Sequence, residues 1–160
     1  MKRLAFFALL GILAALPASG DDVPFAEPPI TKPGENDTYL VGLSDLMLGA
    51  QLRHMKLWQA IKAKNWDLAG FELNEMEESL TKAAMLYRNI PMENISAALT
   101  PLGALRDALK AKDGAGAERG FADLTGACNL CHQAAGVGFI VIKTPAASPF
   151  SNQSFSPAKK

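Results

Sequence analysis

The chain has 160 residues, the usual size of a single domain. An apolar fraction of 49% and a charged fraction of 20% are typical of a globular protein. Lys and Arg together equal Asp and Glu in number, so the net charge is zero. Since no run of basic residues offers a surface for phosphates, we exclude nucleic acid as a partner.

Residues 1–20 have the pattern of a secretory signal sequence. Lys2 and Arg3 precede an apolar stretch, Leu4–Leu16, which is too short to span a bilayer and is followed by small residues. We predict cleavage near Gly20 and export to a bacterial periplasm, with no stable membrane anchor. The alternative is an uncleaved segment that holds the protein at the membrane.

The next part of the chain is predicted to hold an extended lead-in and two amphipathic helices. Residues 21–42 are rich in proline and form the lead-in. The first helix runs from a Ser44 N-cap to about Ala63. Asn65 caps the second helix, and Pro91 ends the helical pattern. The apolar face of the first helix repeats at spacings of seven, four and three, at Met47, His54, Trp58 and Ile61.

Two further helices are predicted in the second half. A turn or two of helix around residues 95–99 is followed by Thr100 and Pro101, which read as an N-cap and the first residue of a third helix. This helix continues to about Lys112. The fourth helix covers residues 115–135, and the glycines directly after it supply a stop.

Four amphipathic helices with short connections predict an all-α fold, an antiparallel up-down-up-down four-helix bundle over residues 43–137. Residues 138–160 follow as a loop tail that we expect to pack on the bundle. The tail contains one β-prone run, Phe139–Ile142. Because a single strand has no partner, we expect this run to lie over the bundle rather than in a sheet.

The densest group of chemically active side chains is Cys128-Asn129-Leu130-Cys131-His132. C-x-x-C-H is the attachment signature of a c-type haem. Two thiols one helical turn apart can each add to one of the two haem vinyl groups. The histidine directly after the second cysteine can then reach the iron from the same side. We therefore predict that one haem c is covalently attached here.

Three other sites use the same residue types. A thioredoxin-like dithiol would follow a strand in a βαβ unit, whereas the residues around the motif read as helix. A zinc site needs four ligands, and His54 is the only other His or Cys in the chain. A structural disulfide between Cys128 and Cys131 would close a very short loop. These three interpretations remain as alternatives to haem attachment, which we favour.

The position of the motif separates two plans for a small cytochrome. When the motif lies near the N-terminus, a methionine ligand follows it, but here all six methionines precede the motif. A helical bundle whose last helix carries C-x-x-C-H resembles the class II c-type cytochromes, the cytochrome c′ and cytochrome c-556 group, over residues 43–137. Gln51–Trp58 and Cys128–Ala135 are similar to a group of little-characterised exported haem proteins of bacteria.

The resemblance implies a haem between the first and last helices. It makes Cys128 and Cys131 the thioether positions and His132 the proximal iron ligand. It also implies a role in electron transfer or gas binding, and it leaves open a homodimer, which many class II relatives form. The tail extends past the usual class II ending, so we expect the haem edge to be more covered than in that class.

The sixth iron ligand decides between these roles. His54 is the first candidate, because it is the only other histidine and shares a helix face with Trp58, whose ring could pack against the porphyrin. Met47 lies two turns earlier on that face and is the second candidate. A vacant position, as in cytochrome c′, is the third. Arg53 and Lys56 flank His54 and could meet the haem propionates, or could simply form a solvated helix face.

We therefore expect a periplasmic monohaem electron carrier that exchanges electrons with redox partner proteins. The alternatives are a five-coordinate haem protein that binds nitric oxide or carbon monoxide, and a structural bundle with a disulfide. The sequence has no acid–base pair beside a nucleophile and no phosphate-binding glycine loop, so we do not expect an enzyme. An acidic patch could dock a basic partner or could simply be solvated; it consists of Glu72, Glu75, Glu77 and Glu78.

Overall fold

The computed structural model describes residues 41–87, 90 and 92–158. The predicted signal sequence and all but the last two residues of the predicted lead-in lie outside these described residues. In the described part of the chain, no helix is both long enough and apolar enough to cross a membrane.

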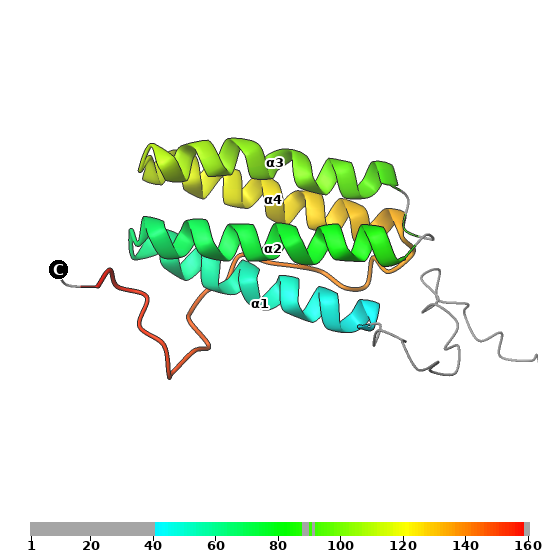
Figure 1. The fold of residues 1–160 in the computed structure, drawn as a ribbon, viewed down its shortest axis with the longest axis horizontal. Helices are drawn as coiled ribbons and strands as arrows, with labels where there is room; N and C mark the ends of the chain where they lie inside the picture. Colours follow the sequence, from blue (N-terminus) through cyan, green and yellow to red (C-terminus); the bar gives the residue numbers. More distant parts are fainter. Residues whose placement is uncertain (1–40, 88–89, 91, 159–160) are drawn as a thin grey trace, which may run out of the picture.

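The described residues form four helices and no strand, which confirms the predicted all-α four-helix bundle. Their bounds are α1 Leu43–Lys62, α2 Trp66–Leu86, α3 Met92–Lys110 and α4 Gly114–Ala134. Successive helices run in opposite directions, so the start of α1 and the end of α4 lie at the same end of the bundle (Figure 1). The tail then returns along the bundle, and Phe155 packs against the core.

The bundle is held by a core to which every helix contributes. Its largest fully buried apolar side chains are Leu57, Leu73, Met76, Leu102, Leu105, Phe121 and Leu124. Gly120 lets α4 approach α3 closely, because a Cβ atom at this position would lie 3.1 Å from the Cβ of Leu105. Burial of the apolar face of each helix in this core, rather than helix propensity alone, stabilises helices of this length.

The connections after α1 and α3 have the same construction. Each helix is followed by a lysine with positive φ, 55° at Lys64 and 56° at Lys112. The N–H groups of this lysine and of the next residue bond to carbonyls of the last turn, which is the pattern of a Schellman C-cap. The next residue, Asn65 or Asp113, then caps the following helix with its side chain. The predicted Asn65 cap is therefore confirmed.

Two predicted N-caps are wrong. α1 begins one residue before Ser44, and its N-cap is Gly42, whose carbonyl accepts the first helical N–H bonds. α3 is continuous through Thr100 and Pro101, and the Thr100 hydroxyl donates to the carbonyl of Ser96 instead of capping a helix. A proline inside a helix costs about 3 kcal/mol. Buried apolar side chains on both sides of Pro101, Ile95 before it and Leu102 and Leu105 after it, offset this cost through their packing.

The paired connections generate a prediction about stability. A left-handed conformation costs an L-residue about 1–2 kcal/mol, whereas glycine adopts it freely and loses only about 0.5–1 kcal/mol of extra entropy on folding. Lys112→Gly should therefore raise the free energy of unfolding by up to about 1 kcal/mol. Lys110→Gly, at a helical position, is the matched control and should lower it. Urea denaturation measures both variants, and a less stable Lys112→Gly protein would contradict the prediction.

Candidate cofactor site

A cavity of about 420 Å³ lies where α1 begins and α4 ends. This size falls within the range of about 300–1,000 Å³ usual for small-molecule and cofactor sites. The lining is mostly apolar. It also contains nearly all the side chains that the sequence singled out for a haem, namely Met47, His54, Cys128, Cys131 and His132. We call it the α1/α4 cavity.

The two cysteines lie one turn apart on α4 with free thiols. Burial raises the pKa of the Cys128 thiol to about 11, with a smaller contribution from the neighbouring Cys131. Burial also raises the pKa of Cys131. Redox-active dithiols depend on a lowered thiol pKa. Both the helical setting and these directions therefore argue against a thioredoxin-like pair.

His132 is oriented by the chain that follows its own helix. Gly136, with φ 73°, ends α4 in a Schellman motif, and the N–H of Val137 bonds back to the carbonyl of His132. The chain then crosses the cavity, and the Ile140 carbonyl lies 2.8 Å from His132 Nδ1. A carbonyl only accepts, so Nδ1 carries the proton. The lone pair of a neutral imidazole is then on Nε2.

We call residues 137–142 the strap. Three of its side chains line the α1/α4 cavity, namely Val137, Ile140 and Ile142. The strap forms no strand, as expected for the β-prone run that makes up its last four residues. It therefore provides one wall of the cavity and also a hydrogen-bond acceptor for His132.

His54 also lines the cavity and is 1% exposed. Its Nε2 is 2.8 Å from the Thr125 hydroxyl, which donates its proton to the Phe121 carbonyl. Thr125 must therefore accept, so Nε2 carries the proton and Nδ1 holds a lone pair. Nδ1 is buried and has no hydrogen-bond partner among the described residues. Burial lowers the pKa of His54 to about 4, which keeps the ring neutral.

Two contacts fix the register between the antiparallel helices α1 and α4. Lys62 pairs with Glu118 at 2.9 Å, and His54 bonds to Thr125. From the first contact to the second, α1 goes back by eight residues, from Lys62 to His54, and α4 goes forward by seven residues, from Glu118 to Thr125. A further seven residues on each helix bring Met47 level with His132. His54 lies about 10 Å deeper along the bundle axis, at about 1.5 Å per residue.

Trp58 lies outside the cavity lining. Its ring packs on Phe121, with centroids 4.9 Å apart, and the Lys62 ammonium lies 5.4 Å from its ring centroid. It shares a face with His54, as the sequence spacing indicated, but sits one turn further from His132. Lys56 also lies outside the lining, with its ammonium 5.2 Å from the ring centroid of Phe150 in the tail.

Sequence reasoning missed the groups that orient the two histidines. Thr125 carries no motif, although it lies on the same face of α4 as Cys128 and Phe121. The Ile140 carbonyl is a backbone group, so no side-chain pattern marks it. Asn129, between the two cysteines, binds the strap through its side chain. Asn129 occupies one of the two x positions of C-x-x-C-H, where the motif specifies no residue type, so the motif gave no reason to single it out.

The residues present fit a covalently attached haem. The cavity offers two free thiols one turn apart and an imidazole with its Nε2 lone pair available, within apolar walls. Among the described residues, no group of three or more His, Cys, Asp or Glu side chains is placed to hold a metal ion directly, which argues against the zinc reading. Comparisons with protein-family models, curated proteins and solved structures give no match to this chain.

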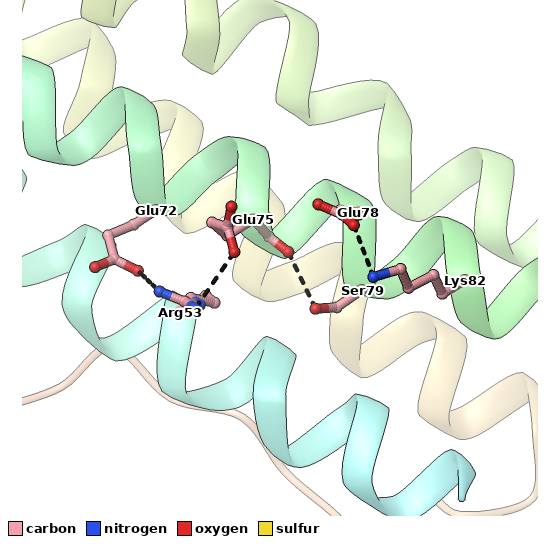
Figure 2. Close-up of polar contacts among 6 residues, drawn as sticks. All are labelled: Arg53, Glu72, Glu75, Glu78, Ser79 and Lys82. Carbon is pink, nitrogen blue, oxygen red and sulfur yellow. Dashed lines mark hydrogen bonds and ion pairs between the residues drawn. The ribbon is translucent and has the colours of Figure 1, made fainter. Parts of the chain in front are cut away.

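Arg53 points to α2 rather than to the cavity, bonding to Glu72 at 3.0 Å and to Glu75 at 3.3 Å (Figure 2). Each glutamate of the acidic patch is in fact paired with a cation of this protein: Glu72 and Glu75 with Arg53, Glu77 with Arg106, and Glu78 with Lys82. These pairs join α2 to its neighbours or neutralise its surface. They argue against two interpretations of the sequence: that Arg53 binds a haem propionate, and that the acidic patch docks a basic partner.

Removing Arg53 should destabilise the bundle, because the Glu72 side chain is only 2% exposed. Arg53→Met leaves a buried carboxylate without its cation and should lower the free energy of unfolding by about 3 kcal/mol. Lys82→Met breaks an exposed surface pair and should cost much less. Chemical denaturation compares them. Equal losses for the two variants would show that the Arg53–Glu72 pair behaves as a surface pair.

His54 should make stability depend on pH. Its pKa in the folded protein, about 4, is below the ordinary value of 6.5, so the unfolded chain takes up the proton first. The contribution of the neutral His54 ring to the free energy of unfolding is fully present above pH 6.5 and is lost as the pH falls toward 4. Between pH 7 and pH 5, the wild-type free energy of unfolding should fall by about 2 kcal/mol more than that of His54→Gln. Parallel pH profiles would contradict the burial argument.

Proposed function

We propose that this protein is a monohaem c-type cytochrome of the bacterial periplasm, similar to the class II cytochromes, and that it carries electrons. The observation that supports this most strongly is the convergence of Cys128, Cys131 and His132 on one apolar cavity. The signal-sequence pattern of residues 1–20 supports export. A haem would supply a one-electron Fe(III)/Fe(II) couple in this cavity.

The two thiols serve attachment in this proposal. Cys128 and Cys131 would hold the haem: each Sγ–H would add across one vinyl group, with the sulfur bonding to one carbon and the hydrogen going to the other, so that no atom leaves. Thiols three positions apart on a helix lie on one side of the cofactor. Cys128 and Cys131 both line the cavity, as this requirement demands.

His132 and Met47 are the two side chains that would hold the iron. His132 presents the Nε2 lone pair because its Nδ1–H is engaged by the strap. Met47 is level with it on α1 and also lines the cavity. His54, the first candidate from the sequence, is two turns deeper and uses its Nε2–H to bind Thr125. A thioether ligand raises the reduction potential relative to two imidazoles.

The surface around the cavity suits contact with redox partner proteins. Leu130 on α4 and Phe139 and Val141 on the strap are large apolar side chains that are well exposed. They lie within or directly beside the segments that line the cavity. Exposed apolar groups of this kind are typical of protein contact sites.

A five-coordinate, gas-binding haem protein is the second candidate. It is favoured by the register between α1 and α4, which places His54, the other histidine of the cavity lining, about 10 Å deeper along the bundle axis than His132. If Met47 does not bind the iron, the apolar wall of α1 leaves room for a small neutral ligand.

Visible spectra of the haem-loaded protein test the proposal. The electron carrier predicts a sharp α band in the reduced state that carbon monoxide does not alter. Met47→Ala should become high-spin and bind carbon monoxide, because the sixth position opens. His54→Ala is the matched control on the same helix and should keep the wild-type spectrum.

Other outcomes discriminate between the candidates. A wild-type spectrum that is already high-spin and shifts with carbon monoxide would support the gas-binding protein over the carrier. A change in His54→Ala but not in Met47→Ala would overturn the register argument and restore two histidines as the axial pair.

A further inference from the structure

The Asn129 side chain makes a two-point contact with the strap. Its Nδ2 donates to the Ile142 carbonyl at 2.9 Å, and its Oδ1 accepts from the Ile142 N–H at 2.7 Å. A side-chain amide thus pairs with both polar groups of one backbone residue, much as a neighbouring strand would. Asn129 is held on α4, between the two cysteines, so the contact ties the far end of the strap to the helix that carries the motif.

Few other polar contacts hold the strap in the described part of the chain. Its near end is fixed by the Schellman turn after α4, and the Ile140 N–H bonds to the Val137 carbonyl. The middle is joined to α4 by His132 Nδ1. Phe139, Ile140 and Val141 are exposed, so apolar burial contributes little there. Asn129 is therefore the main anchor of the part of the strap that follows Ile140.

We propose that Asn129 is a positioning residue for His132 and acts through the strap. By holding Ile142, it keeps the carbonyl of Ile140, two residues earlier, against His132 Nδ1. It also keeps the strap closed as a wall of the α1/α4 cavity. The inference rests on the proposed function, since a positioned imidazole matters only if it binds iron.

The effect follows from the chemistry of an imidazole ligand. A carbonyl acceptor at Nδ1–H fixes the ring orientation and makes Nε2 a more basic ligand. A more basic ligand stabilises the ferric state and lowers the reduction potential. If the strap detaches, water replaces the carbonyl at Nδ1, and the cavity loses its wall. The reduction potential then rises.

Two variants break the same contact from opposite ends. Asn129→Leu has a similar shape but makes neither hydrogen bond. Ile142→Pro removes the N–H that Asn129 accepts and leaves the attachment motif unchanged, so it still reports if the motif variant does not take up haem. Asn152→Ala, an exposed amide elsewhere in the tail, is the matched control.

The measurements are made on the full-length, haem-loaded protein. Hydrogen exchange followed by mass spectrometry should show exchange of the strap amides rising roughly tenfold or more in Asn129→Leu, with α4 unchanged. The reduction potential should shift upward in Asn129→Leu and in Ile142→Pro. Neither property should move in Asn152→Ala.

The outcomes separate the two proposals. Wild-type protein without covalent haem overturns the proposed function, and the role of Asn129 with it. Covalent haem with unchanged strap exchange in Asn129→Leu overturns the anchoring role alone. Faster strap exchange with an unchanged potential shows that Asn129 holds the strap but does not position His132, which also overturns the inference.

Discussion

The arrangement of the cavity depends on the buried hydrogen bond between His54 on α1 and Thr125 on α4. These residues are 71 positions apart in the sequence, yet their contact sets which parts of the two helices face each other. With this register, Met47 and His132 lie level, and Cys128 and Cys131 line the same cavity. A shift of one turn, about 5.4 Å, would separate them. The unpartnered Nδ1 of His54 is a cost that the surrounding core tolerates.

The end of α4 has a second role beyond stopping a helix. Gly136 reverses the chain four residues after His132, so the segment that follows covers the cavity and meets the imidazole. His132, the proposed iron ligand, and the carbonyl that orients it are thus encoded within eight residues of each other. Such local coupling needs no distant element to place the hydrogen-bond acceptor. It explains how an extended, mostly exposed strap can influence the chemistry of the site.

Much of the fold and part of the site could be predicted from the sequence, because both depend on local patterns. The spacing of apolar residues predicted the four helices. The C-x-x-C-H spacing that haem attachment requires singled out Cys128, Cys131 and His132 as candidate site residues. The Ser44 and Thr100 caps failed because tertiary packing overrides local capping preferences. The register could not be predicted, because it depends on contacts between distant helices. Asn129 and the Ile140 carbonyl act through backbone geometry, which no side-chain pattern displays.

Haem attachment is tested most directly by the intact mass of the mature protein made in cells that attach c-type haem. The mass should equal that of the polypeptide plus about 616 Da. This increment should survive denaturation and solvent extraction and disappear when both Cys128 and Cys131 are replaced by alanine. A wild-type mass equal to that of the bare polypeptide would contradict the central claim that these thiols hold a haem.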